Sequence, residues 1–282
     1  MIGLVGYLGF VPPIGVAVAA LLTSGVGTLG GLGGAIMLVP FLVLTGMPVS
    51  QAAPLGLVSV VAASSAAAQR QLKEHTINHR LGVLTETAAT AGAVAGALAA
   101  GAVSEQVLTY VLAIVALGAA VAGGKRKGLR WKPDPTTPKE DIGEWIGTVN
   151  GAYSLNGEVV PYRPKRIGVG MAAMGVAGVI TGVSGVGGGF IKTPANSELM
   201  HVPVKVASST TTFSIGITAA AALLVKAMHG DLDVELAALV ILGSLVGGVV
   251  GSRVQARLAP QTVRRFLSVV LIGVAIILVV RA

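Results

Sequence analysis

Two clusters of glycine, one in each half of the chain, are the residues best suited to hold a small ligand. Residues 185–189 are Gly-Val-Gly-Gly-Gly, residues 31–34 are Gly-Leu-Gly-Gly, and each cluster precedes a short apolar stretch. At a helix start the first backbone N–H groups lack partners within the helix, and the positive end of the helix dipole attracts negative charge. Glycines let these groups approach an anion with no side chain in the way. The clusters therefore predict anion binding, and the candidate residues are Gly33, Gly34, Gly187, Gly188 and Gly189.

Polar side chains near the second cluster could complete such a site. Lys192 lies about one helical turn after the glycines, where an ammonium inside a membrane segment normally faces a cavity or a partner. Residues 208–212 are five consecutive hydroxyl residues, which supply neutral hydrogen-bond donors for anion oxygens. Weaker candidates on the same element are Ser184, Thr193 and Asn196.

Each of these features also has a purely structural interpretation. Glycines let membrane helices pack closely, which is the favoured interpretation of the spaced pairs Gly92/Gly96 and Gly247/Gly251. Lys192 could extend its ammonium to the membrane surface, and hydroxyls in membrane helices often bond only their own backbone or a neighbouring helix.

Two carboxylates are candidates for a proton relay in a coupled transporter. Glu86 lies about a turn into its apolar segment, and Glu198 lies three residues before His201 on one predicted helix face. The favoured alternative for Glu198 is an ion pair with Lys192 or Lys205. Proton coupling through Glu86 or Glu198 stays a hypothesis at this point.

The composition places the protein in a bilayer. Of 282 residues 53% are hydrophobic and only 11% charged, whereas a soluble domain has about a quarter charged residues. No Asp, Glu, Lys or Arg occurs before Arg70, and the sequence shows no signal-peptide cleavage site, so the first apolar segment is expected to stay in the mature protein. The predicted apolar segments are 4–23, 35–46, 51–69, 81–103 and 106–123, followed by 167–183, 189–201, 204–227, 235–252 and 262–281.

The order of these segments predicts an all-α integral membrane protein with two inverted-topology repeats of about five segments each. The glycine clusters recur at an offset of 154 residues. The segments 35–46 and 189–201 are too short to span ~30 Å of hydrocarbon, so they are expected to be broken or re-entrant half-helices. The predicted domains are a first membrane repeat at 1–123, an insert at 124–166 and a second repeat at 167–282.

The distribution of basic residues predicts how the chain lies in the cell membrane. Lys and Arg gather in the loop at 70–80, in the insert and at 253–265, so these parts are placed in the cytoplasm. The acidic loop at 228–235 and both termini are then outside. The same distribution, between apolar segments, argues against nucleic-acid binding despite the net charge of +8. Residues 153–160 of the insert predict a β-hairpin around an Asn-Gly turn. A linking role is the favoured interpretation of the insert, and docking of a partner is the alternative.

Several function classes have no support in the sequence. There is no cysteine, the four histidines are scattered and no zinc or calcium ligand set is visible. The glycine clusters lack the Gly-Lys-Ser/Thr ending of an ATP-binding loop, and no nucleophile–base arrangement is found. We therefore expect no enzyme activity, no metal and no cofactor.

The second glycine cluster, with Phe190, Ile191 and Pro194 after it and the stretch 202–210 downstream, resembles the sulfite exporter TauE/SafE family. The resemblance covers both membrane halves and leaves the insert unexplained. It implies a multi-pass transporter that exports sulfite, organosulfonates or related sulfur anions across the cytoplasmic membrane, and it favours Ser209 and Thr210 among the hydroxyls. A passive anion channel and a non-transporting scaffold acting through the insert are the alternatives. A homodimer is compatible with the sequence, but nothing in it requires one.

Overall fold

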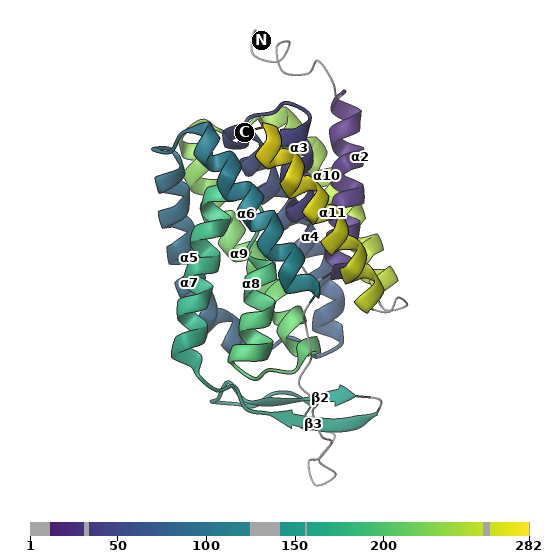
Figure 1. The fold of residues 1–282 in the computed structure, drawn as a ribbon. Helices are drawn as coiled ribbons and strands as arrows, with labels where there is room; N and C mark the ends of the chain where they lie inside the picture. The colour runs from purple at the N-terminus through teal and green to yellow at the C-terminus, as the bar shows by residue number, and fades with distance from the viewer. Residues whose placement is uncertain (1–11, 31–33, 125–141, 156, 256–259, 282) are drawn as a thin grey trace.

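The structure is a computed structural model that describes residues 12–30, 34–124, 142–155, 157–255 and 260–281. Helices dominate it, and a small sheet lies at one end of the helical body (Figure 1). The helices before the sheet are α2 (Pro13–Gly30), α3 (Ala35–Leu44), α4 (Val49–Lys73), α5 (His79–Ala100) and α6 (Glu105–Gly124). Those after it are α7 (Ile167–Ser184), α8 (Gly189–Pro194) with a π-helical continuation (Ala195–Leu199), α9 (Val204–Met228), α10 (Val234–Gln255) and α11 (Pro260–Arg281).

The helix boundaries repeat along the chain. α7 begins and ends 154 residues after α2, and α8 begins 154 residues after α3. α9 and α10 begin and end 155 residues after α4 and α5. Each half thus has a long helix, a short helix and three further long helices in the same order.

Five helices of the described chain are long and apolar enough to cross a membrane, namely α4, α5, α7, α9 and α10. The predicted segments agree closely with the observed helices except for the first. That segment was placed at 4–23, whereas α2 continues to Gly30, and residues 1–11 lie outside the described residues. Gly25, within the part of α2 that lies beyond the predicted segment, packs against Gly247 of α10.

Glycines bring two pairs of helices into close contact. A side chain at Gly247 would collide with the carbonyl of Leu21, and one at Gly96 with the carbonyl of Val179. The glycine pairs Gly92/Gly96 and Gly247/Gly251 therefore act in helix packing, α5 against α7 and α10 against α2, as their structural interpretation predicts.

The contacts also give the helix directions. From Gly243 beside Ala17 to Gly247 beside Leu21, contacting positions advance together, so α2 and α10 are parallel. Ser59 bonds Ser244 and Arg70 bonds the Ser252 carbonyl, so α4 runs the same way as α10. By the same argument α5, α7 and α9 run in one common direction. Because only a short loop joins α4 to α5, this direction is opposite to that of α2, α4 and α10 (Figure 1).

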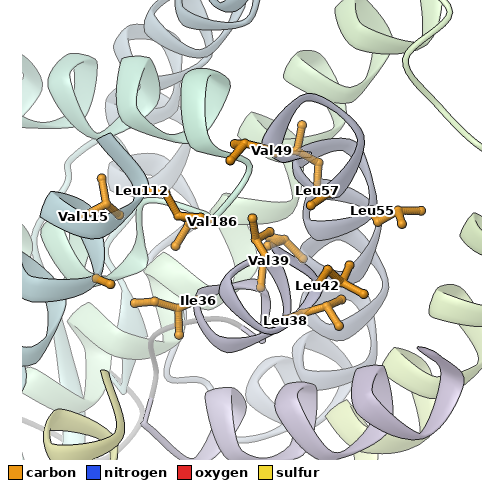
Figure 2. Close-up of a cluster of buried hydrophobic side chains, with 14 of the residues drawn as sticks. Ile36, Leu38, Val39, Leu42, Val49, Leu55, Leu57, Leu112, Val115 and Val186 are labelled. Carbon is orange, nitrogen blue, oxygen red and sulfur yellow. The ribbon is translucent and has the colours of Figure 1, made fainter. Parts of the chain in front are cut away.

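The two short helices turn back inside the helical body. Since α2 and α4 run in one direction, α3 between them returns toward the end where α2 begins, and Gly34 at its start lies against Ser24 of α2. The apolar side chains of this short helix form one buried cluster with side chains of α4, α6 and the loop before α8 (Figure 2). Its members include Ile36, Leu38 and Val39 of α3, Leu55 and Leu57 of α4, Leu112 of α6 and Val186 of the loop. α8 likewise begins beside the middle of α7, where Gly188 lies against Ala177 and Thr181.

The sheet contains the predicted hairpin and one unpredicted strand. β2 (Gly151–Leu155) pairs antiparallel with β3 (Glu158–Tyr162), and Leu155 faces Glu158 across the turn, so the hairpin prediction is confirmed. The short strand β1 (Gly143–Glu144) pairs with β2. Tyr153, Val160 and Tyr162 pack with Leu81 and Met200, which anchors the sheet on the ends of the helices.

Candidate functional site

The second glycine cluster forms a tight turn between α7 and α8. Gly185 and Gly187 have φ angles of +70° and +78°, which favour glycine. Gly188 is the residue before the helix, and its carbonyl accepts the first helical hydrogen bonds from the N–H groups of Ile191 and Lys192. The N–H groups of Gly189 and Phe190 precede these bonds, as at any helix start. The cluster thus starts a helix inside the protein, where all five of its residues are buried.

The side chain of Lys192 is enclosed and paired. It is 1% exposed, and its Nζ lies 2.9 Å from Oε2 and 3.1 Å from Oε1 of Glu86 on α5. Glu86 is 4% exposed. Removing one partner of such a buried pair leaves an uncompensated charge, which is strongly destabilising. Lys192 and Glu86 therefore form one neutral unit within the helical body.

Thr218 of α9 completes this unit. Its hydroxyl accepts a hydrogen bond from Lys192 Nζ at 2.5 Å and donates one to Oε1 of Glu86. Three helices, α5, α8 and α9, each contribute one member of this ion-pair cluster. The sequence suggests separate roles for Lys192 and Glu86 and does not point to Thr218. The signal for Thr218 is its position seven residues, or two turns, after Thr211 on the same face of α9.

Glu198 does not pair with either lysine, contrary to the favoured interpretation. It is exposed in the π-helical segment. Lys192 pairs with Glu86, and the Nζ of Lys205 lies 3.8 Å from a carboxylate oxygen of Glu74. The helix widens to a π-helix directly after Pro194, so the usual spacing of side chains around the helix no longer applies there.

The weaker candidates around α8 are buried. Ser184 donates to the Ile180 carbonyl at 2.7 Å, which is bonding to its own helix. Thr193 is fully buried. Asn196 is 2% exposed and its amide donates to Thr211 Oγ1 at 3.1 Å, while its Oδ1 has no hydrogen-bond partner in the described chain.

Ser209 and Thr210 bond the loop that joins α4 to α5. Thr76 Oγ1 donates to Ser209 Oγ at 3.0 Å, and the Asn78 backbone N–H donates to Thr210 Oγ1 at 3.0 Å. Both residues are buried. Their hydroxyls therefore hold a loop in this conformation.

The first glycine cluster has neutral surroundings. Gly33 lies outside the described residues, and Gly34 is close to the hydroxyl of Ser24. Ser24, Ser59 and Ser244 join their hydroxyls in a closed ring in which each O···O distance is 2.9 Å, and all three are fully buried. This serine ring, from α2, α4 and α10, was also missed, because single serines in apolar helices carry no distinctive spacing.

A small cavity lies between α2, α4, α8 and α9. Its volume is about 20 Å³, enough for one water molecule. It is lined by Thr28, Val60, Ala63, Ser64, Gly189, Thr211, Thr212 and Ile215. Thr211 bonds Asn196 and Gly189 begins α8, so the cavity touches the elements that bear the ion-pair cluster.

Comparison with known proteins decides the family. Residues 16–278 match the family described as Sulfite exporter TauE/SafE. The chain belongs to this family. Part of this TauE/SafE chain is also similar to a "Probable membrane transporter protein YunE" of Bacillus subtilis (strain 168), with 29% identity over 104 residues. The aligned part is 37% of this chain and 38% of that relative, so less than half of either protein is covered. No solved structure matches the chain. Family membership and the apolar helices together identify a multi-pass membrane protein of a transporter family.

Proposed function

We propose that this protein is a secondary transporter that exports small sulfur-containing anions, such as sulfite or organosulfonates, across the cytoplasmic membrane. The family supports the class of cargo. The observation that most strongly favours an anion is the position of Lys192, a buried ammonium one turn after the glycine-rich start of α8. Lys192 would attract the anion, and backbone N–H groups at Gly187, Gly188 and Gly189 would bind its oxygens.

The transport cycle rests on two inverted repeats. Corresponding helices have equivalent boundaries, while α2 and α4 run opposite to α7 and α9, which supports this arrangement. One repeat would rock against the other around the site, as in other transporters with inverted repeats. The excess of basic residues in the insert and around 70–80 supports a cytoplasmic sheet, with both termini outside.

Contributions from other candidates are part of the same proposal. Gly34 would present the start of α3, and Asn196, Thr193, Ser184, Ser209 and Thr210 would contact the anion once the helices move. Asn196 would bind the anion through its Nδ2 amide, which donates to Thr211 Oγ1 in this structure, because an anion oxygen can only accept a hydrogen bond. The proposal gives the two halves unequal shares, because the counterpart of Lys192 is Leu38.

The test is transport by purified protein in proteoliposomes. Sulfite, sulfoacetate, thiosulfate, ethanesulfonate and chloride are compared side by side for the wild type and Lys192→Ala. We expect saturable transport of at least one sulfur anion, well above chloride, and its loss in the variant. Ohmic flux of chloride and sulfite alike would indicate a channel. Transport that survives Lys192→Ala would remove this lysine from the site, and no movement of any sulfur anion would contradict the proposed cargo.

The scaffold alternative is tested by the insert. If the protein acts only by docking a partner, deleting residues 142–162 abolishes its function while Lys192→Ala leaves it intact. If the protein is a transporter, Lys192→Ala should reduce transport in proteoliposomes more than deletion of residues 142–162 does.

A further inference from the structure

Among the residues that the structure describes, the ion-pair cluster of Lys192, Glu86 and Thr218 has no other charged group beside it. α8 and its π-helical continuation pack against α6, α7 and α9, and α5 packs against α7 and α9. α7 has no charged residue. Apart from the cluster itself and the exposed Tyr110 of α6, the charged or titratable residues on the remaining elements are His79, Arg80, Glu105, Glu198, Lys205 and Lys226.

Each of these six groups is either exposed or has a partner away from the cluster. His79 lies 3.7 Å from Glu144 of the sheet, and the backbone N–H of Arg80 bonds the same carboxylate. Glu105 bonds the N–H groups at the start of α4. Lys205 lies near Glu74, and Glu198 is exposed. Lys226 is buried two turns beyond Thr218, in the last turn of α9 near Asp231. Among the described residues, Glu86 makes the one ion pair of Lys192.

This isolation restricts what can bind to Lys192. With Glu86 ionised the cluster has no net charge. An anion that takes the ammonium from Glu86 brings one negative charge and leaves a carboxylate enclosed by protein without its partner. A buried charge in that position is strongly unfavourable and is normally neutralised by a proton. With Glu86 protonated, Lys192 positive and a monoanion bound, the net charge is again zero.

Resting on the proposed function, we propose that Glu86 takes up one proton for each anion bound at Lys192, so that the protein co-transports a monoanion and a proton without moving net charge. The proton comes from the aqueous side to which the site is open and binds a carboxylate oxygen of Glu86. In export the proton and the anion both leave on the outer side, so the outward gradient of the anion must exceed any opposing pH gradient, and the Glu86–Lys192 pair then forms again.

Thr218 suits both states of this cycle. Its hydroxyl donates to Glu86 while the carboxylate is ionised, and the same oxygen can accept from the protonated form. The other half of the protein has no equivalent. The counterparts of Lys192, Glu86 and Thr218 at the offsets of 154 and 155 residues are Leu38, Ile241 and Ala63. One charged cluster per chain gives a ratio of one proton to one anion.

The experiment uses the wild type and a sulfonate, because ethanesulfonate keeps one negative charge at all relevant pH values. A pH gradient of one unit, alkaline inside, is imposed on proteoliposomes whose membrane potential is held at zero. We expect about tenfold accumulation of the sulfonate, because one pH unit is a tenfold ratio of protons. A membrane potential without a pH gradient is expected to produce no accumulation. If no sulfonate is transported, sulfite below neutral pH, where it is the bisulfite monoanion, replaces it.

Glu86→Gln changes the driving force in a defined way. The amide fixes the uncharged state, so the site becomes positive when empty and neutral when loaded. Accumulation should no longer respond to the pH gradient and should respond to potential, about tenfold per 59 mV for one charge. Glu158→Gln, an exposed carboxylate on β3, is the matched control and should behave as the wild type.

The outcomes separate the two proposals. Wild-type accumulation that follows potential and ignores the pH gradient overturns proton coupling while leaving sulfur-anion transport intact. A loss of pH-driven accumulation in Glu198→Gln with its retention in Glu86→Gln would assign the proton to Glu198 and also overturn the inference. The wild-type measurement decides the question even if Glu86→Gln does not fold. No transport of any sulfur anion contradicts the proposed function itself.

Discussion

The backbone N–H of Asn78 donates a hydrogen bond to the Thr210 hydroxyl at 3.0 Å, which joins the α4–α5 loop to α9. The Asn78 side chain then donates to the Val149 carbonyl and to the Tyr162 hydroxyl in the sheet. One asparagine thus connects the helix that bears Thr218 to the sheet at the end of the bundle. A movement of α9 would therefore displace the sheet as well.

Thr210→Val tests whether this hydroxyl acts in folding or in anion binding. The change leaves the buried Asn78 N–H without its acceptor, which costs about 1–3 kcal/mol. We expect a lower melting temperature together with a weaker affinity for sulfite, because the same hydroxyl is proposed to contact the anion once the helices move. Thr87→Val, at an exposed position of α5 where the hydroxyl bonds only its own helix, is the control and should melt like the wild type. A lower melting temperature with unchanged affinity for sulfite would restrict Thr210 to holding the loop and would remove it from the proposed substrate site.

Gly185→Ala tests the turn before α8. The φ of +70° disfavours a side chain, and a Cβ there would also collide with Ala53 of α4. Gly46→Ala is a matched control, because Gly46 has a φ of +99° with nothing near its Cβ position. We expect Gly46→Ala to cost about 1–2 kcal/mol from backbone strain alone. Gly185→Ala should cost clearly more, measured by thermal unfolding in detergent. Equal losses of stability for the two variants would mean that α4 can move away from a side chain at residue 185 with no loss of folding free energy.

The helices could be predicted from the sequence with good accuracy because their boundaries have local causes. Apolar segments, Gly clusters and charged loops lie at equivalent positions of both halves, and the predicted starts differ from the observed ones by two residues or fewer for every helix except α2. The hairpin at 151–162 follows from its Asn-Gly turn in the same way. Such features depend on neighbours in the sequence, so the sequence alone is enough to place them.

The partners within the site could not be predicted, because they come from distant parts of the chain. Glu86 and Lys192 are 106 residues apart, and no local spacing relates them. The sequence makes Lys192 a candidate for anion binding and favours an ion pair of Glu198 with Lys192 or Lys205. The π-helical turn after Pro194 displaces Glu198 to the surface, and His201, with a φ of +54°, lies in a turn rather than on the same helix face.

Thr218→Val and Ser244→Ala compare a hydroxyl beside a charge with one in the neutral serine ring. Ser244→Ala leaves the Ser24–Ser59 hydrogen bond in place, and we expect a loss of about 0.6–1.7 kcal/mol. Thr218→Val removes a donor from the ionised Glu86, and hydrogen bonds to charged groups contribute about 1.5–3 kcal/mol. The larger loss should therefore be in Thr218→Val, measured as the shift in thermal unfolding. A larger effect of Ser244→Ala would show that the serine ring is the more important of the two polar clusters for stability.

Tyr162 predicts how pH acts on the attachment of the sheet. The pKa of Tyr162 is raised to about 12, mainly by burial and to a smaller extent by Glu144, while the hydrogen bond from Asn78 lowers it. The folded protein therefore holds the phenolic proton more tightly than the unfolded chain, whose tyrosine has a pKa near 10. The stabilisation is complete below pH 10 and is lost as the pH rises toward 12, by about 2–3 kcal/mol. The protection of the backbone amides of residues 151–162 against hydrogen exchange, corrected for intrinsic rates, should be constant from pH 6 to 9. It should fall above pH 10.

Tyr162→Phe should reverse this pattern. Without the hydroxyl, Asn78 loses one acceptor, which costs about 1 kcal/mol at neutral pH. Because residue 162 then has no phenol to ionise, the additional loss above pH 10 should be smaller than in the wild type. Tyr110→Phe, at a position 40% exposed on α6, controls for alkaline effects elsewhere and should leave both the neutral stability and the alkaline loss unchanged. An alkaline loss as large in Tyr162→Phe as in the wild type would show that another group controls the attachment of the sheet.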